Sequence, residues 1–237
     1  MAEMNSLLNP WFVLTLIFLL IWIVIFIFVK RSRKEMLWAS ILTAPFGLTE
    51  PLFVPEYWNP PSLFNFATKT GFDIESLIWC FAVGGIAAVL FESVFKVKHL
   101  KISKEEMHKR KHKLHLFTLI LPIPIFLVLY FATSINTIYI ASISMFIGAI
   151  GAFYCRPDLK KKIFFGGLLF LVLYFMAFFL FILVYPEIVE SVWNLNAISE
   201  ILIFKVPLEE LVFAIIFGML WSGYYEHIKW YKLSRHD

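Results

Sequence analysis

The chain has 237 residues, of which 60% are hydrophobic and 16% charged, and its formal net charge at pH 7 is +4. Segments near 20 apolar residues recur along it, which is the length needed to span about 30 Å of hydrocarbon. This pattern excludes an ordinary soluble domain and predicts an all-α integral membrane protein.

The apolar runs predict seven transmembrane helices. In chain order they cover residues 11–29, 36–54, 74–95, 116–133, 135–154, 163–185 and 206–225. The first run is not interpreted as a signal peptide, because MAEMNSLLNP before it has no basic residue and KRSRK follows it.

Lysine and arginine alternate from one side of the predicted membrane to the other. Basic segments follow the first, third, fifth and seventh helices, at residues 30–34, 96–113, 156–162 and 229–235, and the intervening loops are poor in both residues. The positive-inside rule therefore predicts a cell-membrane protein with its N-terminus outside and its C-terminus in the cytoplasm. We assign the net positive charge to topology and anionic headgroups, and expect no nucleic acid partner.

Two parts of the sequence resemble each other. DIESLIWCFAVGGIAAVLFE (73–92) lies over PLEELVFAIIFGMLWSGYYE (207–226) without a gap, and FVPEYW and VYPEIVESVW precede them in turn. The alignment pairs identical residues: Glu75 with Glu209, Leu77 with Leu211, Gly84 with Gly218, and Glu92 with Glu226.

This similarity predicts two three-helix repeats, covering residues 1–97 and 135–237. A basic cytoplasmic loop and a linking fourth helix, residues 98–134, join them. Because one helix separates the copies, the two repeats are expected to be parallel, with a ligand cavity between them.

Glu209 and Glu210 stand side by side in the first turn of the last predicted helix. Ionisable groups in a membrane segment commonly mark function. Two carboxyls close together in an apolar place do not both ionise readily, so one can serve as an acid catalyst. Glu75 is the counterpart in the first repeat, and Glu50 is a weaker participant. The alternative interpretation is that these acids only stabilise helix N-termini.

Other residues have structural interpretations. His108, His112 and His115 would align on one helix face for a metal, but the basic residues around them would repel a cation, so we expect a solvated loop and no metal site. Cys80 and Cys155 are interpreted as small apolar residues. No glycine-rich phosphate motif is present, so no cofactor is expected. Four tryptophans are placed in interfacial belts: Trp11, Trp58, Trp193 and Trp230.

The PLEELVF start and YYE end of residues 207–226, with the weaker DIESLIW and LFE copy, resemble the lycopene cyclase domain of heterodimeric and fused carotenoid cyclases. The predicted three-plus-one-plus-three layout looks like the fused form. Two departures stand out: Asp73 replaces the motif proline and Ser76 replaces the second glutamate.

The resemblance implies a redox-neutral cyclisation of a linear carotenoid end group. An acid protonates a terminal double bond, the carbocation closes a ring away from water, and a base removes a proton. Under this resemblance Glu209 and Glu210 are the best acid and base candidates, with Glu75 as the counterpart in the other repeat and Glu50 as a weaker participant. The expected partners are the lipid bilayer and the carotenoid, with carotenoid-pathway enzymes or a second copy of the chain as further candidates.

Two other functional classes are compatible with the sequence. One is a small-solute transporter with the same parallel repeats, although the chain has no glutamine for the Pro-Gln pairs of such carriers. The other is a non-catalytic carotenoid-binding membrane protein.

Overall fold

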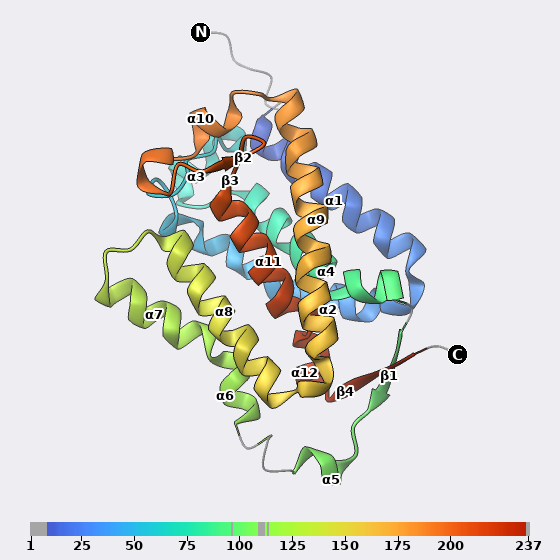
Figure 1. Cartoon of the computed structure of the whole chain (residues 1–237). Coiled ribbons are helices and arrows are strands. Elements are labelled where there is room, and N and C mark those ends of the chain that lie inside the picture. Colours follow the sequence, from blue (N-terminus) through green and yellow to red (C-terminus); the bar gives the residue numbers. More distant parts are fainter. Residues whose placement is uncertain (1–8, 96, 109–111, 113, 236–237) are drawn as a thin grey trace.

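The computed structural model describes residues 9–95, 97–108, 112 and 114–235. The structure is 77% helical, and its described residues form no closed sheet (Figure 1). Among the described residues, five helices are long and apolar enough to cross a membrane: Pro10–Phe28, Ile74–Phe95, Thr137–Cys155, Pro157–Val184 and Leu208–Lys229. The prediction of a helical, multi-pass membrane protein is therefore confirmed in outline.

The principal helical elements follow one another with short connections. They are α1 (Pro10–Phe28), α2 (Arg33–Thr43), the 3₁₀ helix η3 (Ala44–Leu52), α4 (Ile74–Phe95), α7 (Pro122–Ala132), α8 (Thr137–Cys155), α9 (Lys160–Val184) and α11 (Leu208–Ser222).

Shorter elements connect them at the two ends of the molecule. The α-helices are α3 (Phe66–Thr70), α5 (Lys104–Met107), α6 (His115–Ile120), α10 (Ile188–Val192) and α12 (Tyr224–Lys229). The 3₁₀ helices are η2 (Lys30–Ser32), η4 (Leu63–Asn65), η6 (Pro157–Leu159) and η7 (Leu195–Ala197). Strand β1 (Val97–Lys101) pairs antiparallel with β4 (Tyr231–Arg235), and β2 (Leu202–Ile203) pairs antiparallel with β3 (Val206–Pro207).

Two predicted spans are not continuous α-helices. The predicted helix 36–54 ends at Thr43 and continues as the 3₁₀ helix η3, which has Pro45 near its start and Pro51 inside it. The predicted helix 116–133 divides into α6 and α7 at Leu121, just before Pro122. Proline lacks an amide donor and therefore removes a helical hydrogen bond, so each break has a local cause. The count of seven spans stays a prediction.

Gly47 brings η3 against α4. A Cβ atom at Gly47 would lie 2.6 Å from the backbone nitrogen of Leu77, closer than real side chains approach. Because glycine has no side chain there, the η3 backbone touches the α4 backbone. Glu50, three residues later on η3, is thereby held beside the first turn of α4.

The two halves of the chain pack in a similar way. Helix α4 packs against α1 and α2, and α11 packs against α8 and α9. The halves then meet where α4 contacts α9 and α11. This is the packing that two three-helix units would produce, and the repeat arrangement itself remains our prediction.

A buried carboxylate–lysine cluster, formed by Lys162, Glu35, Glu92, Glu226 and His99, joins the halves at the end of the molecule where β1 and β4 pair. The Lys162 ammonium donates to Glu35 at 2.9 Å and to Glu226 at 2.5 Å, and also pairs with Glu92. His99 Nε2 lies 2.6 Å from Glu226 Oε1. Helices α2, α4, α9 and α12 are tied together by these contacts.

Some charges attributed to topology are therefore internal. Lys162 is 1% exposed and Arg156 is fully buried, where its guanidinium pairs with Asp158 and donates to the backbone carbonyl of Glu226. The prediction that these two residues face headgroups is wrong, because each has a nearby acceptor inside the protein. Part of the basic segment that was expected to be a solvated loop instead forms strand β1, which pairs with β4. Residues 96, 109–111 and 113 of that segment lie outside the described residues.

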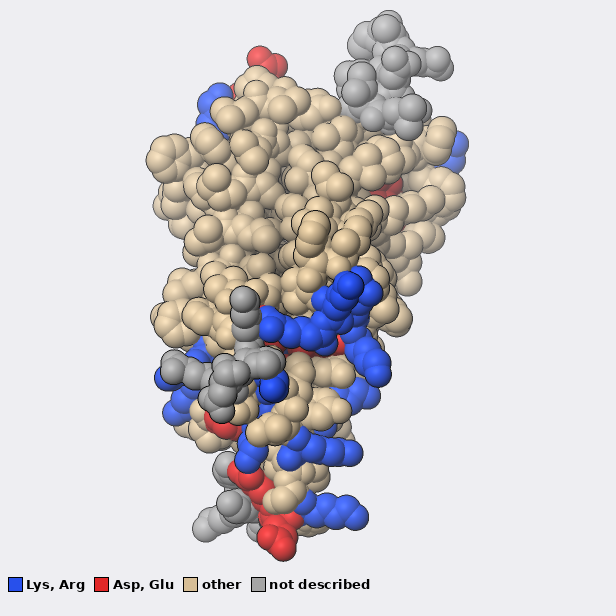
Figure 2. Space-filling model, turned by 90° about the vertical axis from the view of Figure 1, so that its right-hand side faces the viewer, with Lys and Arg blue, Asp and Glu red and all other residues tan. Residues whose placement is uncertain are grey.

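The surface charge is nevertheless unevenly distributed. Figure 2 shows that most lysine and arginine side chains on its face gather in the lower half of the molecule, while the upper half is largely uncharged. The predicted orientation, with the basic end in the cytoplasm, requires such a separation of charge.

We expect Lys162→Met to destabilise the protein by about 3–5 kcal/mol, because it leaves three carboxyls buried without their cation. The neighbouring Lys161 is exposed, so Lys161→Met is the matched control and should unfold at the wild-type temperature. Thermal unfolding in detergent, followed by size-exclusion fluorescence, measures both. A Lys162→Met protein as stable as Lys161→Met would contradict the structural role of the cluster.

Candidate active site

A cavity of about 560 Å³ lies between the two halves of the chain. Its walls come from α1, η3, α4, α7, α8, α9 and α11, and its volume is in the range typical of small-molecule sites. Aromatic side chains dominate the lining, among them Trp79, Phe178, Phe213, Phe217 and Trp221. The cavity is therefore suited to an apolar ligand.

The cavity reaches the molecular surface at η3 and α7. Three residues that line it are also well exposed on the molecular surface: Phe46 on η3, at 50%, and Ile123 and Leu127 on α7, at 55% and 48%. An opening with such a rim faces hydrocarbon in a membrane, so an apolar molecule can reach the cavity from the bilayer without crossing water.

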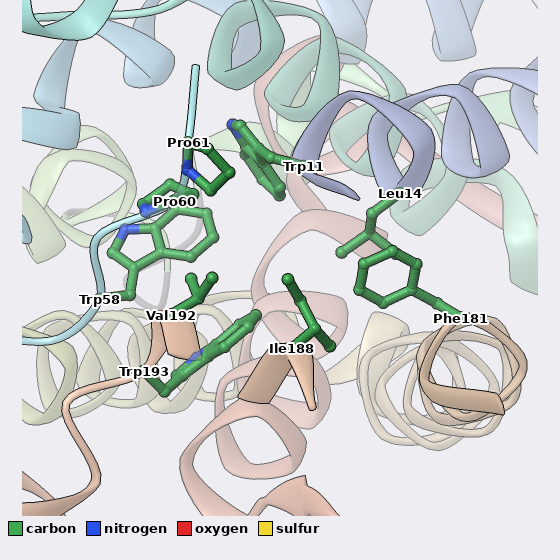
Figure 3. Close-up of a pocket in the computed structure, with 9 residues that line it drawn as sticks. All are labelled: Trp11, Leu14, Trp58, Pro60, Pro61, Phe181, Ile188, Val192 and Trp193. Carbon is green, nitrogen blue, oxygen red and sulfur yellow. The ribbon is translucent and has the colours of Figure 1, made fainter. Parts of the chain in front are cut away.

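Three tryptophans form one wall of the cavity. Trp11 packs edge-on against Trp58 at a ring distance of 4.5 Å, and Trp58 lies 5.6 Å from Trp193 (Figure 3). These three residues and Leu14 line both the cavity and the pocket of about 10 Å³ in Figure 3, so they form the wall between the two.

The tryptophan wall joins the two Pro-Glu segments that the sequence paired. Trp58 and Trp193 form an isolated antiparallel bridge. Trp11 and Trp193 are 4% and 5% exposed, so their predicted place in an interfacial belt is wrong. Each indole N–H instead donates to a buried carboxylate: Trp11 to Asp73, and Trp193 to Glu210.

Glu210 projects from the first turn of α11 into the cavity wall. Its Oε1 accepts hydrogen bonds from the Tyr57 hydroxyl at 2.6 Å and from Trp193 at 2.9 Å, and its Oε2 accepts one from the Tyr174 hydroxyl at 2.5 Å. Burial, reinforced by the nearby Glu210 charge, raises the pKa of Tyr57 well above its ordinary value, so this phenol keeps its proton and donates. Three donors fix the carboxylate in one orientation.

Glu50 lines the same cavity from the other half of the chain. It lies beside the Asp73 carboxyl and the Ser76 side chain, and its Oε2 has no hydrogen-bond partner among the described residues. Asp73 is already engaged, because it accepts hydrogen bonds from Trp11 Nε1 at 3.1 Å and from the Ser76 amide at 2.5 Å. Two adjacent carboxyls in an apolar wall do not both ionise readily. The structure therefore places a carboxyl pair here: the sequence proposed Glu50 but did not pair it with Asp73.

Glu209 and Glu75 occupy matching positions behind the cavity wall. Glu75 Oε1 accepts a hydrogen bond from the Leu63 amide at 2.6 Å, and Glu209 Oε1 accepts one from the Ser199 amide at 2.9 Å and another from the Tyr139 hydroxyl. Of the acidic residues that the structure describes, the cavity is lined by Glu50 and Glu210. Glu209 and Glu75 instead tether the loops that precede their helices.

Tyr57, Tyr174 and Asp73 are the polar residues of this site that the sequence did not identify. Tyr57 and Trp193 belong to the paired FVPEYW and VYPEIVESVW segments, so that repeat was the available signal for them. Tyr174 stands within an unbroken apolar run that carries no such signal.

We expect Glu75→Ala to accelerate amide hydrogen exchange around Leu63, and Glu209→Ala to do so around Ser199, by about 10- to 100-fold, since hydrogen bonds to charged groups contribute about 1.5–3 kcal/mol. Exchange mass spectrometry of peptides from the two loops measures both effects. Glu210→Ala is the control, because Glu210 accepts neither amide. Unchanged exchange in both loops would remove the tethering role.

Comparison with known proteins finds a family match in the second half of the chain. A family model described as lycopene cyclase matches residues 136–228, which span α8, α9 and α11 and include Tyr174, Trp193 and Glu210. The predicted family resemblance is thereby confirmed. No curated protein and no solved structure matches the chain.

Proposed function

We propose that this chain, in which residues 136–228 match the lycopene cyclase family, converts the end group of a linear carotenoid to a ring without net redox change. One observation carries the proposal beyond the family match. Two carboxyl groups, Glu50 and Glu210, line one apolar cavity from opposite halves of the chain, and Glu50 lies beside the Asp73 carboxyl.

Glu50 is the proposed acid. The Asp73 carboxyl already accepts hydrogen bonds from Trp11 and from the Ser76 amide, whereas Glu50 lines the cavity and its Oε2 has no hydrogen-bond partner among the described residues, so we assign the transferable proton to Glu50. Transfer of that proton to a terminal carbon–carbon double bond produces a tertiary carbocation. Attack by a neighbouring double bond on the cation then closes the ring.

Glu210 is the proposed base and the counter-charge for the cation. Its carboxylate is held by Tyr57, Tyr174 and Trp193, so it need not reorganise as positive charge develops nearby. Removal of one proton from the cyclised cation restores a double bond. One proton enters and one leaves, so the reaction needs no oxidant, reductant or cofactor.

The aromatic walls support the same chemistry. Trp79 and Phe213 stack with ring centroids 6.1 Å apart, and both line the cavity. Aromatic faces attract a cation, and a dry cavity prevents water from trapping it. In this proposal Glu209 and Glu75 are positioning residues, which hold the first turns of α11 and α4 against the loops above the cavity.

We expect Glu50→Gln and Glu210→Gln each to reduce ring formation by about 10² to 10⁴-fold, because glutamine keeps the shape but cannot exchange a proton as a carboxyl does. Glu75→Gln and Glu209→Gln should have smaller effects. Expression in a lycopene-accumulating bacterium, followed by pigment chromatography at matched membrane levels, gives the measurement.

Three results of this experiment would contradict parts of the proposal. Normal cyclisation by both cavity variants would make Glu50 and Glu210 structural. Larger losses from Glu75→Gln and Glu209→Gln would move the chemistry behind the cavity wall. Co-purified pigment without any cyclised product from the wild type would indicate a carotenoid-binding protein instead.

The proposed orientation places the N-terminus outside and the C-terminus in the cytoplasm. We expect tags at Met1 and in the 186–199 loop to be accessible from outside intact cells, and a tag at Asp237 to become accessible only after permeabilisation. A cytoplasmic protein tagged in the same way controls for leakage. External access to the Asp237 tag would overturn this orientation.

A further inference from the structure

A second cluster of reactive side chains lies at the β1/β4 end of the molecule. Cys155, the last residue of α8, faces His112, which precedes α6, and His115, the first residue of α6. The sequence pattern grouped His112 and His115 with His108, but His108 is exposed and its Nδ1 bonds the carbonyl oxygen of Lys104 at 2.6 Å. The third member of the cluster in the structure is therefore the Cys155 thiol, which is distant in sequence, and not His108.

The distances in this cluster match a tetrahedral metal site. Cys155 Sγ lies 3.6 Å from His112 Nδ1 and 3.5 Å from His115 Nδ1, and all three atoms lie within 4.8 Å of one another. Zinc bonds of 2.3 Å to sulfur and 2.0–2.1 Å to nitrogen, at tetrahedral angles, put sulfur and nitrogen about 3.6 Å apart. One cation can therefore bind all three atoms with little rearrangement.

A further histidine next to the cluster lacks hydrogen bonds. His227 on α12 is 1% exposed, and neither of its ring nitrogens has a hydrogen-bond partner among the described residues. Its ring lies 4.4 Å from that of His115, which also stacks on Trp230 at 3.7 Å. Buried polar groups are normally satisfied by protein, water or metal, so His227 indicates that a ligand belongs nearby.

The surrounding charges are compatible with a cation. Arg156 follows Cys155 directly, but its guanidinium is paired with Asp158. Metal binding would deprotonate the Cys155 thiol and place one negative charge in the site. The carboxylate–lysine cluster is a poorer candidate, because Lys162 already occupies its centre.

We propose that Cys155, His112 and His115 bind a zinc-class divalent cation, with His227 beside the fourth coordination position. A thiolate and two imidazoles favour zinc over magnesium or calcium, which prefer oxygen ligands. The ion would fasten the start of α6 to the end of α8 and to α12. This structural role is independent of the proposed cyclase chemistry.

Cobalt substitution of the full-length protein tests the site. The protein is purified in detergent without a histidine tag and titrated with Co²⁺. We expect one equivalent to produce thiolate charge-transfer and tetrahedral absorption bands, which Zn²⁺ then displaces. Cys155→Ala and His115→Ala should abolish the bands, while the matched controls Cys80→Ala and His108→Ala should retain them. His227→Ala should weaken affinity by about 10- to 100-fold, the range for groups that support metal ligands.

A thiol-protection assay keeps the test informative if the ligand variants fail to fold. In the Cys80→Ala protein, Zn²⁺ should slow alkylation of Cys155, and a chelator should restore its rate. Absence of both protection and cobalt bands would leave only hydrogen bonds between thiol and imidazoles, and would overturn the proposal. Binding that survives Cys155→Ala, or that is lost with His108→Ala, would place the metal on surface histidines and overturn it equally.

Discussion

The structure depends on the burial of one lysine charge among three carboxyls. Lys162 holds Glu35 and Glu92 from the first half of the chain together with Glu226 from the second. A charge in an apolar interior is costly unless it is paired, so neither half can bury its share of this cluster without the other. These contacts tie α4 to α9 and α12, and α11 packs against both α4 and α9, which aligns the two walls of the cavity.

The two halves of the chain contribute carboxyl groups to the cavity from different positions. Where the second half has Glu210, the aligned residue of the first half is Ser76, and Glu50 reaches the same region from η3. Gly47 and the two prolines make that possible, because they turn the end of α2 into a 3₁₀ segment that lies directly on α4. The result is an asymmetric cavity, with a carboxyl pair on one side and a single carboxylate bound by three donors on the other.

The sequence predicted the helices well wherever hydrophobicity alone decides the structure. The predicted span 74–95 coincides with α4, and the first, fifth and sixth predicted helices agree within a few residues with α1, α8 and α9. The prediction of helices from the sequence failed where proline changed the helix type. The prediction of surface charge failed where charge is buried, because a lysine next to a helix is ordinarily interpreted as a surface residue. The sequence identified the four glutamates of the site. It could not show which of them line the cavity and which bind loops, because that depends on the direction of each side chain. Asp73 and Tyr174 gain their importance only from contacts between distant helices.

Under the proposed function, the place where the cavity reaches the surface, at η3 and α7, sets the order in which the two ends of a long substrate react. A rod-shaped molecule longer than the cavity leaves its far end in the lipid while its near end occupies the space between Glu50 and Glu210. Under the proposed function, one end therefore reacts at each visit, and the molecule must withdraw and return reversed before the other can. The enzyme would act distributively, and the singly cyclised pigment would be released into the bilayer before any doubly cyclised product forms.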